Sequence, residues 1–260
     1  MNIRFIDSPP QEGEFNMSCD YTLAVQAKPG DDALLRIYTW LEPTISIGFH
    51  QKAEDIDYIL CEKDGISVVR RPTGGRAILH WGEITYCFIA AMQVGGGQKA
   101  LGEIYRKAHT AIHNALRMHG LNVNFAAGKK IIRKQSPLCF ATSVGTELEY
   151  EGKKVVGSAQ RLLKSTVLQH GSILISPEHL KLPDYLNVSE ELRQRLREKL
   201  ELSSTHLPLR DDKSFRITMG KSFANIFEGK VYRTDLTSDE NIQIGKDRPR
   251  FIINEFNSSV

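Results

Sequence analysis

The order of strand-like and helix-like segments is the feature that most limits the fold of this chain. Up to Ala90, short apolar or alternating segments of strand length follow one another, with few segments of helical spacing between them. The expected strands are 2–7, 34–38, 44–49, 67–71, 77–79 and 84–90, and the expected helices are an amphipathic 14–28 and a short 53–61. Because strands and helices do not alternate regularly, the sequence predicts an α+β fold with a mixed, largely antiparallel sheet and flanking helices.

The second half of the chain adds longer helices. Residues 101–119 carry one apolar stripe and end at Gly120, which is typical of an amphipathic helix with a glycine stop. Strands are expected at 147–150 and 154–160 around the turn Glu151-Gly152, and at 167–175, interrupted by Gly171. Further helices are expected at 189–201 and 216–227. We therefore expect one domain, residues 1–260, with a helical C-terminal part from about residue 189.

Composition excludes several classes of protein. Lys and Arg number 34 against 31 Asp and Glu, and the resulting net charge of +3 is too small to demand nucleic acid as a partner. No apolar stretch approaches the ~18 residues of a membrane-spanning helix, and residues 1–15 lack the apolar centre of a signal peptide. The 4 cysteines show no CxxC spacing. We therefore expect reduced thiols, no zinc site and a cytoplasmic protein.

The segment VVRRPTGGRAILH, residues 68–80, places arginines and a Gly-Gly turn between two strands. Gly74 and Gly75 permit positive φ and a close approach of backbone N–H groups to a ligand. Arg70, Arg71 and Arg76 beside such a turn favour an anionic or carbonyl-bearing group. The competing interpretation is a solvated β-turn with surface arginines. The segment matches neither a Walker A loop nor a dinucleotide-binding fingerprint.

A second segment, GKKVVGSAQR, residues 152–161, places Lys154 just after the expected hairpin turn. A lysine held against a sheet can polarise a carbonyl or stabilise a nearby anion. The small residues Gly157, Ser158 and Ala159 leave room for a ligand beside it. A solvent-exposed hairpin lysine is the competing interpretation.

Together, RRPTGGRAILH and KVVGSAQ resemble the lipoate/biotin protein ligase catalytic domain. Residues 4–20 and 35–51 contribute to the resemblance, which extends to about residue 175. It implies a mixed sheet with flanking helices, related to the cores of biotin ligases and class II aminoacyl-tRNA synthetases. It also implies that the substrate is bound by residues of the two segments, namely Arg70, Arg71, Gly74, Gly75, Arg76, His80, Gly157, Ser158 and Ala159.

Within that family, the chain resembles the cysteine-dependent branch. ATP-dependent lipoate ligases usually have a third glycine where Arg76 stands here, and an Asn-Asp pair ahead of the lysine hairpin. The segments SPLCFATS, 136–143, and LQHGSIL, 168–174, instead resemble octanoyl-[acyl-carrier-protein]:protein N-octanoyltransferases. This implies that Cys139 carries the acyl group as a thioester and that Lys154, fifteen residues later, lowers the pKa of its thiol.

The same resemblance implies the partners. The donor would be octanoyl-acyl carrier protein, and the acceptor a lysine of a lipoyl-accepting protein, either glycine cleavage H protein or a 2-oxoacid dehydrogenase lipoyl domain. No cofactor, metal, nucleic acid or membrane is expected. A free thiol has a pKa of ~8.5, and a neighbouring ammonium increases its thiolate fraction near neutral pH. Exchange between two thioesters needs no ATP. The base for the acceptor amine stays open between neutral Lys154 and water.

The remaining cysteines and the histidines are weaker candidates. Cys19, Cys61 and Cys87 lie in apolar patterns and are expected in the core.

His80 is expected to organise the pocket by hydrogen bonding, with a catalytic base as the alternative. The family often has an acidic residue directly after this histidine, whereas Trp81 stands here and Glu83 follows His80 by three residues. A pairing of His80 with a carboxylate is therefore open. His109 and His113 are expected on a solvated helix face, and His170 either borders the pocket or caps a strand.

Three other functions compete with octanoyl transfer. An ATP-dependent lipoate–protein ligase would keep the fold and form an acyl-adenylate. An amidotransferase would move the acyl group between lipoyl proteins through Cys139. A carrier-protein binding module would keep the fold without catalysis, although the presence of Cys139 and Lys154 argues against it.

Overall fold

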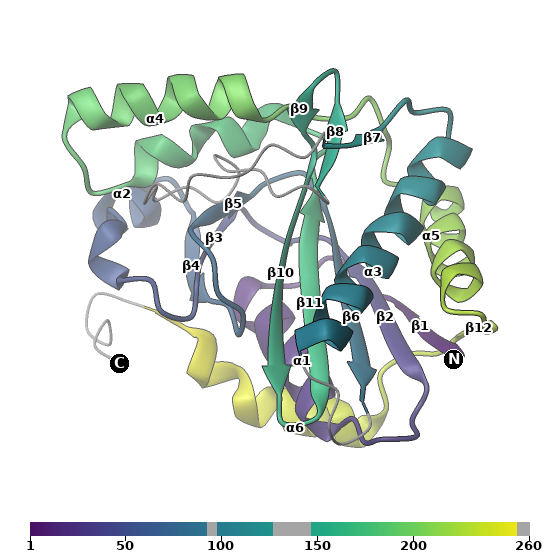
Figure 1. The fold of residues 1–260 in the computed structure, drawn as a ribbon. Helices are drawn as coiled ribbons and strands as arrows, with labels where there is room; N and C mark the ends of the chain where they lie inside the picture. Colours follow the sequence, from purple (N-terminus) through teal and green to yellow (C-terminus); the bar gives the residue numbers. More distant parts are fainter. Residues whose placement is uncertain (93–97, 127–146, 254–260) are drawn as a thin grey trace.

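A six-stranded sheet forms the centre of the molecule (Figure 1). The computed structural model describes residues 1–92, 98–126 and 147–253. In spatial order the strands are β10 (Val156–Leu163), β11 (Thr166–Ile173), β6 (Ile84–Ala91), β2 (Ala33–Tyr38), β1 (Ile3–Asp7) and β12 (Val231–Arg233). The pairs from β10 to β2 are antiparallel, whereas β1 pairs in parallel with both β2 and β12. The predicted mixed, largely antiparallel sheet is confirmed.

Two small sheets accompany the central one. In the first, β3 (Thr44–Ile47) lies between β4 (Ser67–Arg70), to which it is parallel, and β5 (Ile78–His80), to which it is antiparallel. The chain between β4 and β5 contains the turn at Gly74 and Gly75. The second sheet consists of β7 (Asn124–Phe125), β8 (Leu148–Tyr150) and β9 (Lys153–Lys154).

Helices cover both faces of the central sheet (Figure 1). The α-helices are α1 (Gly13–Gln26), α2 (Tyr58–Lys63), α3 (Gln98–Met118), α4 (Glu190–Ser203), α5 (Lys213–Ile226) and α6 (Ser238–Asp247). Short 3-10 helices are η1 (Ala53–Asp55), η2 (Pro177–Tyr185) and η3 (Arg248–Phe251). Helices α3 and α5 share a core with one face of the sheet, and α1 and α6 share a core with the other. Among the residues described, no helix is both long and apolar enough to cross a membrane.

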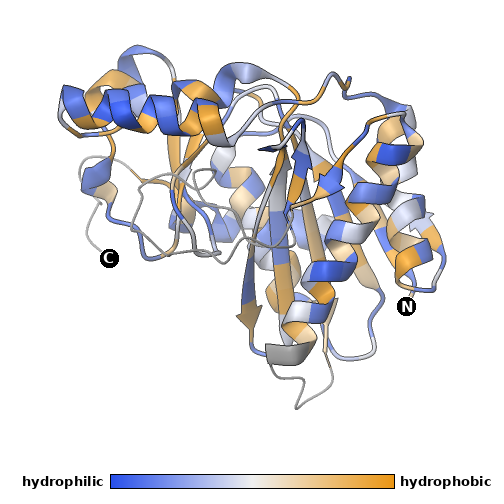
Figure 2. Ribbon diagram, turned by 45° about the horizontal axis from the view of Figure 1, so that its top comes forward, coloured by the Kyte–Doolittle hydropathy of each residue, from blue (hydrophilic) through white to orange (hydrophobic). Residues whose placement is uncertain are grey.

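Alternation along the strands explains this layering. Phe5 and Leu35 point into the core beneath α3 and α5, whereas their neighbours Ile6 and Leu34 point into the core beneath α1. Successive side chains of a strand face opposite sides, so a strand buried on both faces is apolar at most positions. Figure 2 shows the complementary pattern on α3, where hydrophilic residues are interspersed with hydrophobic ones. The amphipathic helix predicted at 101–119 is confirmed.

Helix α1 is where the pattern of the sequence misleads. The helix is present, but the prediction of one polar, solvated face is wrong, because Asn16, Ser18, Asp20 and Thr22 are all buried. Each of these side chains hydrogen-bonds to a residue distant in sequence; Ser18 Oγ, for instance, donates to the carbonyl of Ile244 in α6. The helix is enclosed between the sheet on one side and α6 with η3 on the other.

Smaller differences have local causes. The helix predicted at 53–61 is split into η1 and α2. Strand β11 is not interrupted at Gly171, which pairs in register with Tyr86 and Ser158. A Cβ at Gly171 would lie 2.4 Å from the carbonyl oxygen of Gly157, so the glycine allows β10 and β11 to approach closely rather than ending the strand.

A buried ion pair fastens α1 to the sheet. Arg36 of β2 donates through Nη1 to Asp20 Oδ1 at 3.0 Å, and both side chains are 0% exposed. The hydroxyl of Tyr38 and Nδ1 of His170 donate to Asp20 Oδ2 at 2.8 and 3.0 Å. Burial alone would raise the pKa of the Asp20 carboxyl, but the bond from His170 and the charge of Arg36 hold that pKa below its ordinary value. Burial lowers the pKa of His170, so this imidazole is neutral.

We predict that Asp20→Asn destabilises the fold in a pH-dependent way. Near neutral pH the substitution leaves the Arg36 charge buried without its carboxylate, and the expected loss of unfolding free energy is about 3–5 kcal/mol. The depressed pKa of Asp20 stabilises the fold above the unfolded pKa of about 3.9 and ceases to do so as the pH falls through the folded value. The difference between variant and wild type should therefore shrink in acid. Urea unfolding between pH 3 and 8 measures it, with the exposed Asp239→Asn as control. A gap that does not change with pH would contradict this account.

Candidate functional site

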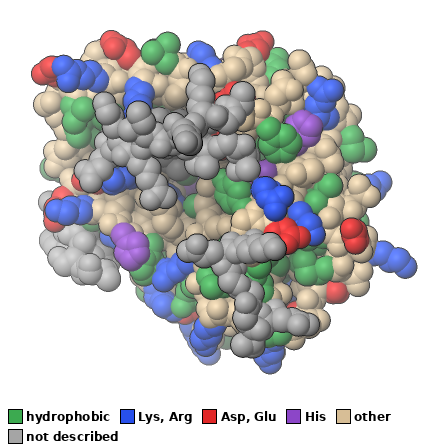
Figure 3. Space-filling model, in the orientation of Figure 1, with side chains coloured by type: hydrophobic (Ala, Val, Ile, Leu, Met, Phe, Trp, Pro, Cys, Tyr) green, Lys and Arg blue, Asp and Glu red, His purple; other side chains and the backbone are tan. Residues whose placement is uncertain are grey.

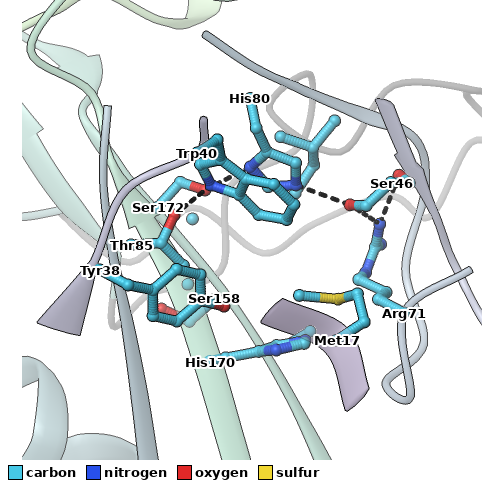
Figure 4. A pocket seen from close by; sticks show the side chains of 14 residues that line it. Met17, Tyr38, Trp40, Ser46, Arg71, His80, Thr85, Ser158, His170 and Ser172 are labelled. Carbon is cyan, nitrogen blue, oxygen red and sulfur yellow. Dashed lines mark hydrogen bonds between the residues drawn. The ribbon is translucent and has the colours of Figure 1, made fainter. Parts of the chain in front are cut away.

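One pocket is lined by residues of α1, the central sheet and the β3–β5 sheet (Figure 4). Met17, Tyr38, Trp40 and Ile78 supply bulky side chains, and Thr85 adds a hydroxyl. Ser46, Arg71 and His80 come from the smaller sheet and its turn, and the remaining lining residues belong to β10 and β11, namely Gly157, Ser158, Ala159, His170, Gly171 and Ser172. The wall along β10 thus consists of small residues, and the smaller sheet and its turn contribute a serine, an arginine and a histidine.

The pocket unites the two segments that the sequence analysis singled out. Arg71 and His80 come from the first segment, and Gly157, Ser158 and Ala159 from the second. The pocket also includes His170, as the first of its two alternatives expected. Arg70, Gly74, Gly75 and Arg76, the other residues expected to bind substrate, lie in or beside the same turn and do not line this pocket.

The two adjacent arginines use their donors on backbone carbonyls. Arg71 is 3% exposed and donates to the carbonyls of Ser46, Gly74 and Arg76 at 2.7–3.1 Å. Arg70 Nη1 donates to the carbonyls of Gly48, Phe49 and Gln51 at 3.1, 3.1 and 2.7 Å. Both guanidinium groups therefore hold loops in place, and a direct contact of either with substrate stays a prediction.

Two glycines shape the turn for different reasons. Gly75, at its exposed tip, has a φ of +99°, which side-chain-bearing residues rarely adopt, so the expected positive φ is found at Gly75 and not at Gly74. Gly48 lies beneath the tip, where a Cβ would stand 2.1 Å from the carbonyl oxygen of Gly75. Gly74 has open space around the position of a Cβ. The 48–51 loop and the turn can therefore touch only because residue 48 has no side chain.

His80 is paired with a carboxylate, which resolves the question left open by the sequence. Its Nδ1 lies 2.7 Å from Oε1 of Glu83, and its Nε2 lies 2.7 Å from Oγ of Ser46. Hydroxyls of Thr85 and Ser172 donate to the same carboxylate oxygen at 2.8 and 2.6 Å. The Trp40 ring stacks on the imidazole, with ring centres 4.0 Å apart (Figure 4). The histidine is therefore held on three sides.

Lys154 is buried rather than exposed. The side chain is 4% exposed and forms an ion pair with Glu147, which is 5% exposed. The two residues belong to the same hairpin, because Glu147 precedes β8 and Lys154 ends β9. Lys154 lies two residues before Val156, where β10 begins, and the next three residues of β10 line the pocket. The alternative of a solvent-exposed hairpin lysine is wrong.

Cys139 lies outside the described residues, so its predicted role stays a prediction. The other three cysteines are buried in the core, as predicted. Burial raises the pKa of Cys19 and of Cys61 to about 12, and raises the pKa of Cys87 well above its ordinary value. These thiols are protonated at neutral pH and are therefore poor nucleophiles.

The solvated helix face predicted for His109 and His113 is wrong. His109 is fully buried, and its Nε2 lies 2.9 Å from the hydroxyl of Ser158 on β10. His113 is partly buried, and its Nε2 donates to the carbonyl of Val123 at 3.1 Å. Both imidazoles serve contacts between α3 and its neighbours.

Several lining residues were missed by the sequence analysis. Ser46 stands between Ile45 and Ile47, a pattern that indicates one solvated strand face, whereas that face borders the pocket. Met17 and Trp40 carried no signal that distinguished them from ordinary core residues. Glu83 was recognised as close in sequence to His80, which is the one signal that could have led to the pair.

Comparison with known proteins identifies the family. Residues 12–209 match the family described as "Lipoyl protein ligase A/B catalytic domain". The chain belongs to this family. An "Octanoyltransferase LipM" of Carboxydothermus hydrogenoformans is 36% identical over 245 residues, covering 91% of each chain. The protein of the same name from Bacillus subtilis is 33% identical, covering 87% of this chain and 84% of its own. These relatives confirm the predicted activity, octanoyl transfer in protein lipoylation.

Solved structures of the family share the fold. A bipartite lipoate protein ligase from Thermoplasma acidophilum superposes with a TM-score of 0.78 at 19% identity, covering 96% of this chain and 93% of that one. A lipoate-protein ligase A bound with ATP gives a TM-score of 0.75 at 20% identity, covering 96% and 95%. At such identities the likeness concerns the fold alone.

We predict that Gly48→Ala disturbs the site while Gly74→Ala does not. The new methyl group at residue 48 must displace the backbone at Gly75, and crowding of this kind typically costs about 1–3 kcal/mol. At Gly74 the methyl group meets open space, so the expected change in stability is within about 0.5 kcal/mol. Urea unfolding and the rate of octanoyl transfer, measured on both variants, check this. Equal stability and equal transfer rates in the two variants would show that the 48–51 loop and the turn can accommodate a methyl group at residue 48.

Proposed function

We propose that this chain moves an octanoyl group from octanoyl-acyl carrier protein to Cys139, and from the resulting thioester to a lysine of a lipoyl-accepting protein. The observation that carries the proposal is the buried Lys154, since it is paired with Glu147 and adjoins the strand that lines the pocket. An ammonium group beside a thiol favours the thiolate, which is the nucleophile in thioester exchange. The motif around Cys139 and the relatives named octanoyltransferases support the same reaction.

The residues that line the pocket offer contacts for an apolar acyl chain. Along β10 and β11 the lining residues are glycine, alanine and serine together with His170, so most side chains on this wall are small. Met17, Trp40 and Ile78 offer apolar contacts on the other walls. Burial of each methylene group contributes about 0.8 kcal/mol, so an acyl chain that packs against these side chains gains affinity with each methylene group it buries.

A related protein and the charge of the chain support the proposed acceptor and donor. The bipartite lipoate protein ligase of Thermoplasma acidophilum is described together with its E2 lipoyl domain. A lipoyl domain is also the acceptor that we propose for this chain. Figure 3 shows Lys and Arg side chains interspersed with Asp and Glu around one face of the molecule. The net charge of +3 favours encounter with acidic carrier proteins only modestly.

Intact mass spectrometry tests the proposal directly. The wild-type protein, mixed with octanoyl-acyl carrier protein and no ATP, should gain one octanoyl group on Cys139, and addition of a lipoyl domain should remove it. Cys139→Ser should keep the melting temperature and lose the transfer. Octanoylation of the acceptor that requires ATP and free octanoate would instead indicate an acyl-adenylate ligase, and acyl transfer from one lipoylated domain to another would indicate an amidotransferase.

We predict that Lys154→Met raises the apparent pKa of the Cys139 thiol. Loss of one ammonium group close to the thiol should shift its titration upward by about 1–3 pH units, and acylation should slow accordingly near neutral pH. The rate of alkylation by iodoacetamide between pH 5 and 10, followed at Cys139 by peptide mass, measures the shift. Lys153→Met is the matched control, because Lys153 lies in the same hairpin and its Nζ donates to the carbonyl of Glu201. Identical alkylation profiles for wild type and Lys154→Met would show that Lys154 does not lie beside the Cys139 thiol.

A further inference from the structure

Ser46, His80 and Glu83 form a continuous hydrogen-bonded chain at one wall of the pocket. Ser46 Oγ lies 2.7 Å from His80 Nε2, and His80 Nδ1 lies 2.7 Å from Glu83 Oε1. Ser46 and His80 line the pocket itself, opposite the small residues of β10 (Figure 4). All three residues are at least 95% buried.

The partners of each atom set the direction of the hydrogens. Glu83 Oε1 receives the hydroxyls of Thr85 and Ser172, so it acts as an acceptor and His80 Nδ1 carries the proton. His80 Nε2 is then the acceptor, and the hydroxyl of Ser46 donates to it. Arg71 Nη1 donates to Ser46 Oγ at 3.1 Å. A hydroxyl oxygen has two lone pairs, so one remains for a further donor from the pocket.

A second feature of Glu83 points to the same use. Its other oxygen, Oε2, is buried and has no hydrogen-bond partner among the described residues. An unsatisfied buried carboxylate oxygen is costly, and such groups recur at catalytic sites. The charge that would compensate it is an imidazolium at residue 80. When His80 takes up a proton, the positive charge of its imidazolium balances the negative charge of the Glu83 carboxylate.

We propose that Ser46 and His80, positioned by Glu83, are the general base for the acceptor lysine. This inference rests on the proposed function. The acceptor ε-amine, in its neutral form, attacks the thioester carbonyl of octanoyl-Cys139, and the C–N bond forms. As the C–S bond breaks, the N–H proton passes to Ser46 Oγ, and the Ser46 hydroxyl proton passes to His80 Nε2. The thiolate of Cys139 leaves with the electron pair of the C–S bond, and the imidazolium later releases its proton to water.

Charged groups and an aromatic ring surround the His80 imidazole. Charged and titratable groups face it from three elements: Glu83 before β6, Arg71 through Ser46, and His170 on β11. Trp40 covers one face of its ring and shields it from water. A positioned general base of this kind typically contributes about 10²–10⁴ to the rate.

Single-turnover kinetics on the full chain test the proposal. Acylation of Cys139 by octanoyl-acyl carrier protein, and discharge of the isolated octanoyl-enzyme to a lipoyl domain, are measured separately from pH 5.5 to 9. His80→Asn and Ser46→Ala should slow the discharge by about 10²-fold or more, and should slow it far more than they slow acylation. The pH profile of discharge should differ between wild type and His80→Asn, because the variant has no imidazole to take up the proton. The control His119→Asn removes a histidine that bonds to the Thr218 hydroxyl outside the pocket, and it should change neither step.

A small nucleophile separates catalysis from structure. Hydroxylamine is largely unprotonated at neutral pH and needs no base. It should therefore cleave the octanoyl-Cys139 thioester of the His80→Asn variant at close to the wild-type rate. Equal losses in acylation, discharge and hydroxylamine cleavage would show that His80 is structural, and an unchanged discharge rate would also overturn the proposal. An octanoyl group found on Ser46 in Cys139→Ser would make Ser46 a nucleophile instead. Absence of octanoyl-Cys139 in the wild type would contradict the proposed function itself, which is a different outcome.

Discussion

The buried ion pair of Asp20 and Arg36 is the contact on which the rest of the structure depends. It joins α1 to the middle of the central sheet, and the same carboxylate holds Tyr38 and His170, which both line the pocket. A pair of this kind is weak evidence for net stability, because taking two charges out of water costs nearly as much as their attraction returns. Its clearest effect is geometric. One carboxylate fixes side chains from a helix and two strands relative to one another.

Arginine serves the neighbouring sheet in a different way. Arg71 joins the carbonyls of Ser46, Gly74 and Arg76, so a single guanidinium ties β3 to the turn that follows β4. The group is always charged and presents its donors in a rigid plane, which suits it for several carbonyls at once. Its contact with the Ser46 hydroxyl then connects the scaffold to the pocket. Residues that look like anion binders in the sequence can thus be the framework that shapes a site.

Local patterns were sufficient for most elements of the fold and for the outline of the site. Strands and the helix at 101–119 could be predicted because their apolar periodicity reflects a sheet covered on both faces. The burial of α1 could not, because Asp20 and Thr22 are satisfied by Arg36, His170 and Asp247, and sequence distance conceals such partners. The motifs single out His80 and the β10 residues, which line the pocket, whereas the pairing of His80 with Glu83 and Ser46 depends on how two strands and a turn meet.

The stacking of Trp40 on His80 gives the pocket an optical property. The chain has only two tryptophans, and Trp40 is the one that lines the pocket, with its indole Nε1 donating to Thr85 at 2.8 Å. Indole emission is quenched by a protonated imidazole in contact with the ring and shifts in colour when water leaves the surroundings. Charge on His80 and entry of an acyl chain therefore both reach the same fluorophore. The enzyme carries its own reporter of occupancy, readable without a label.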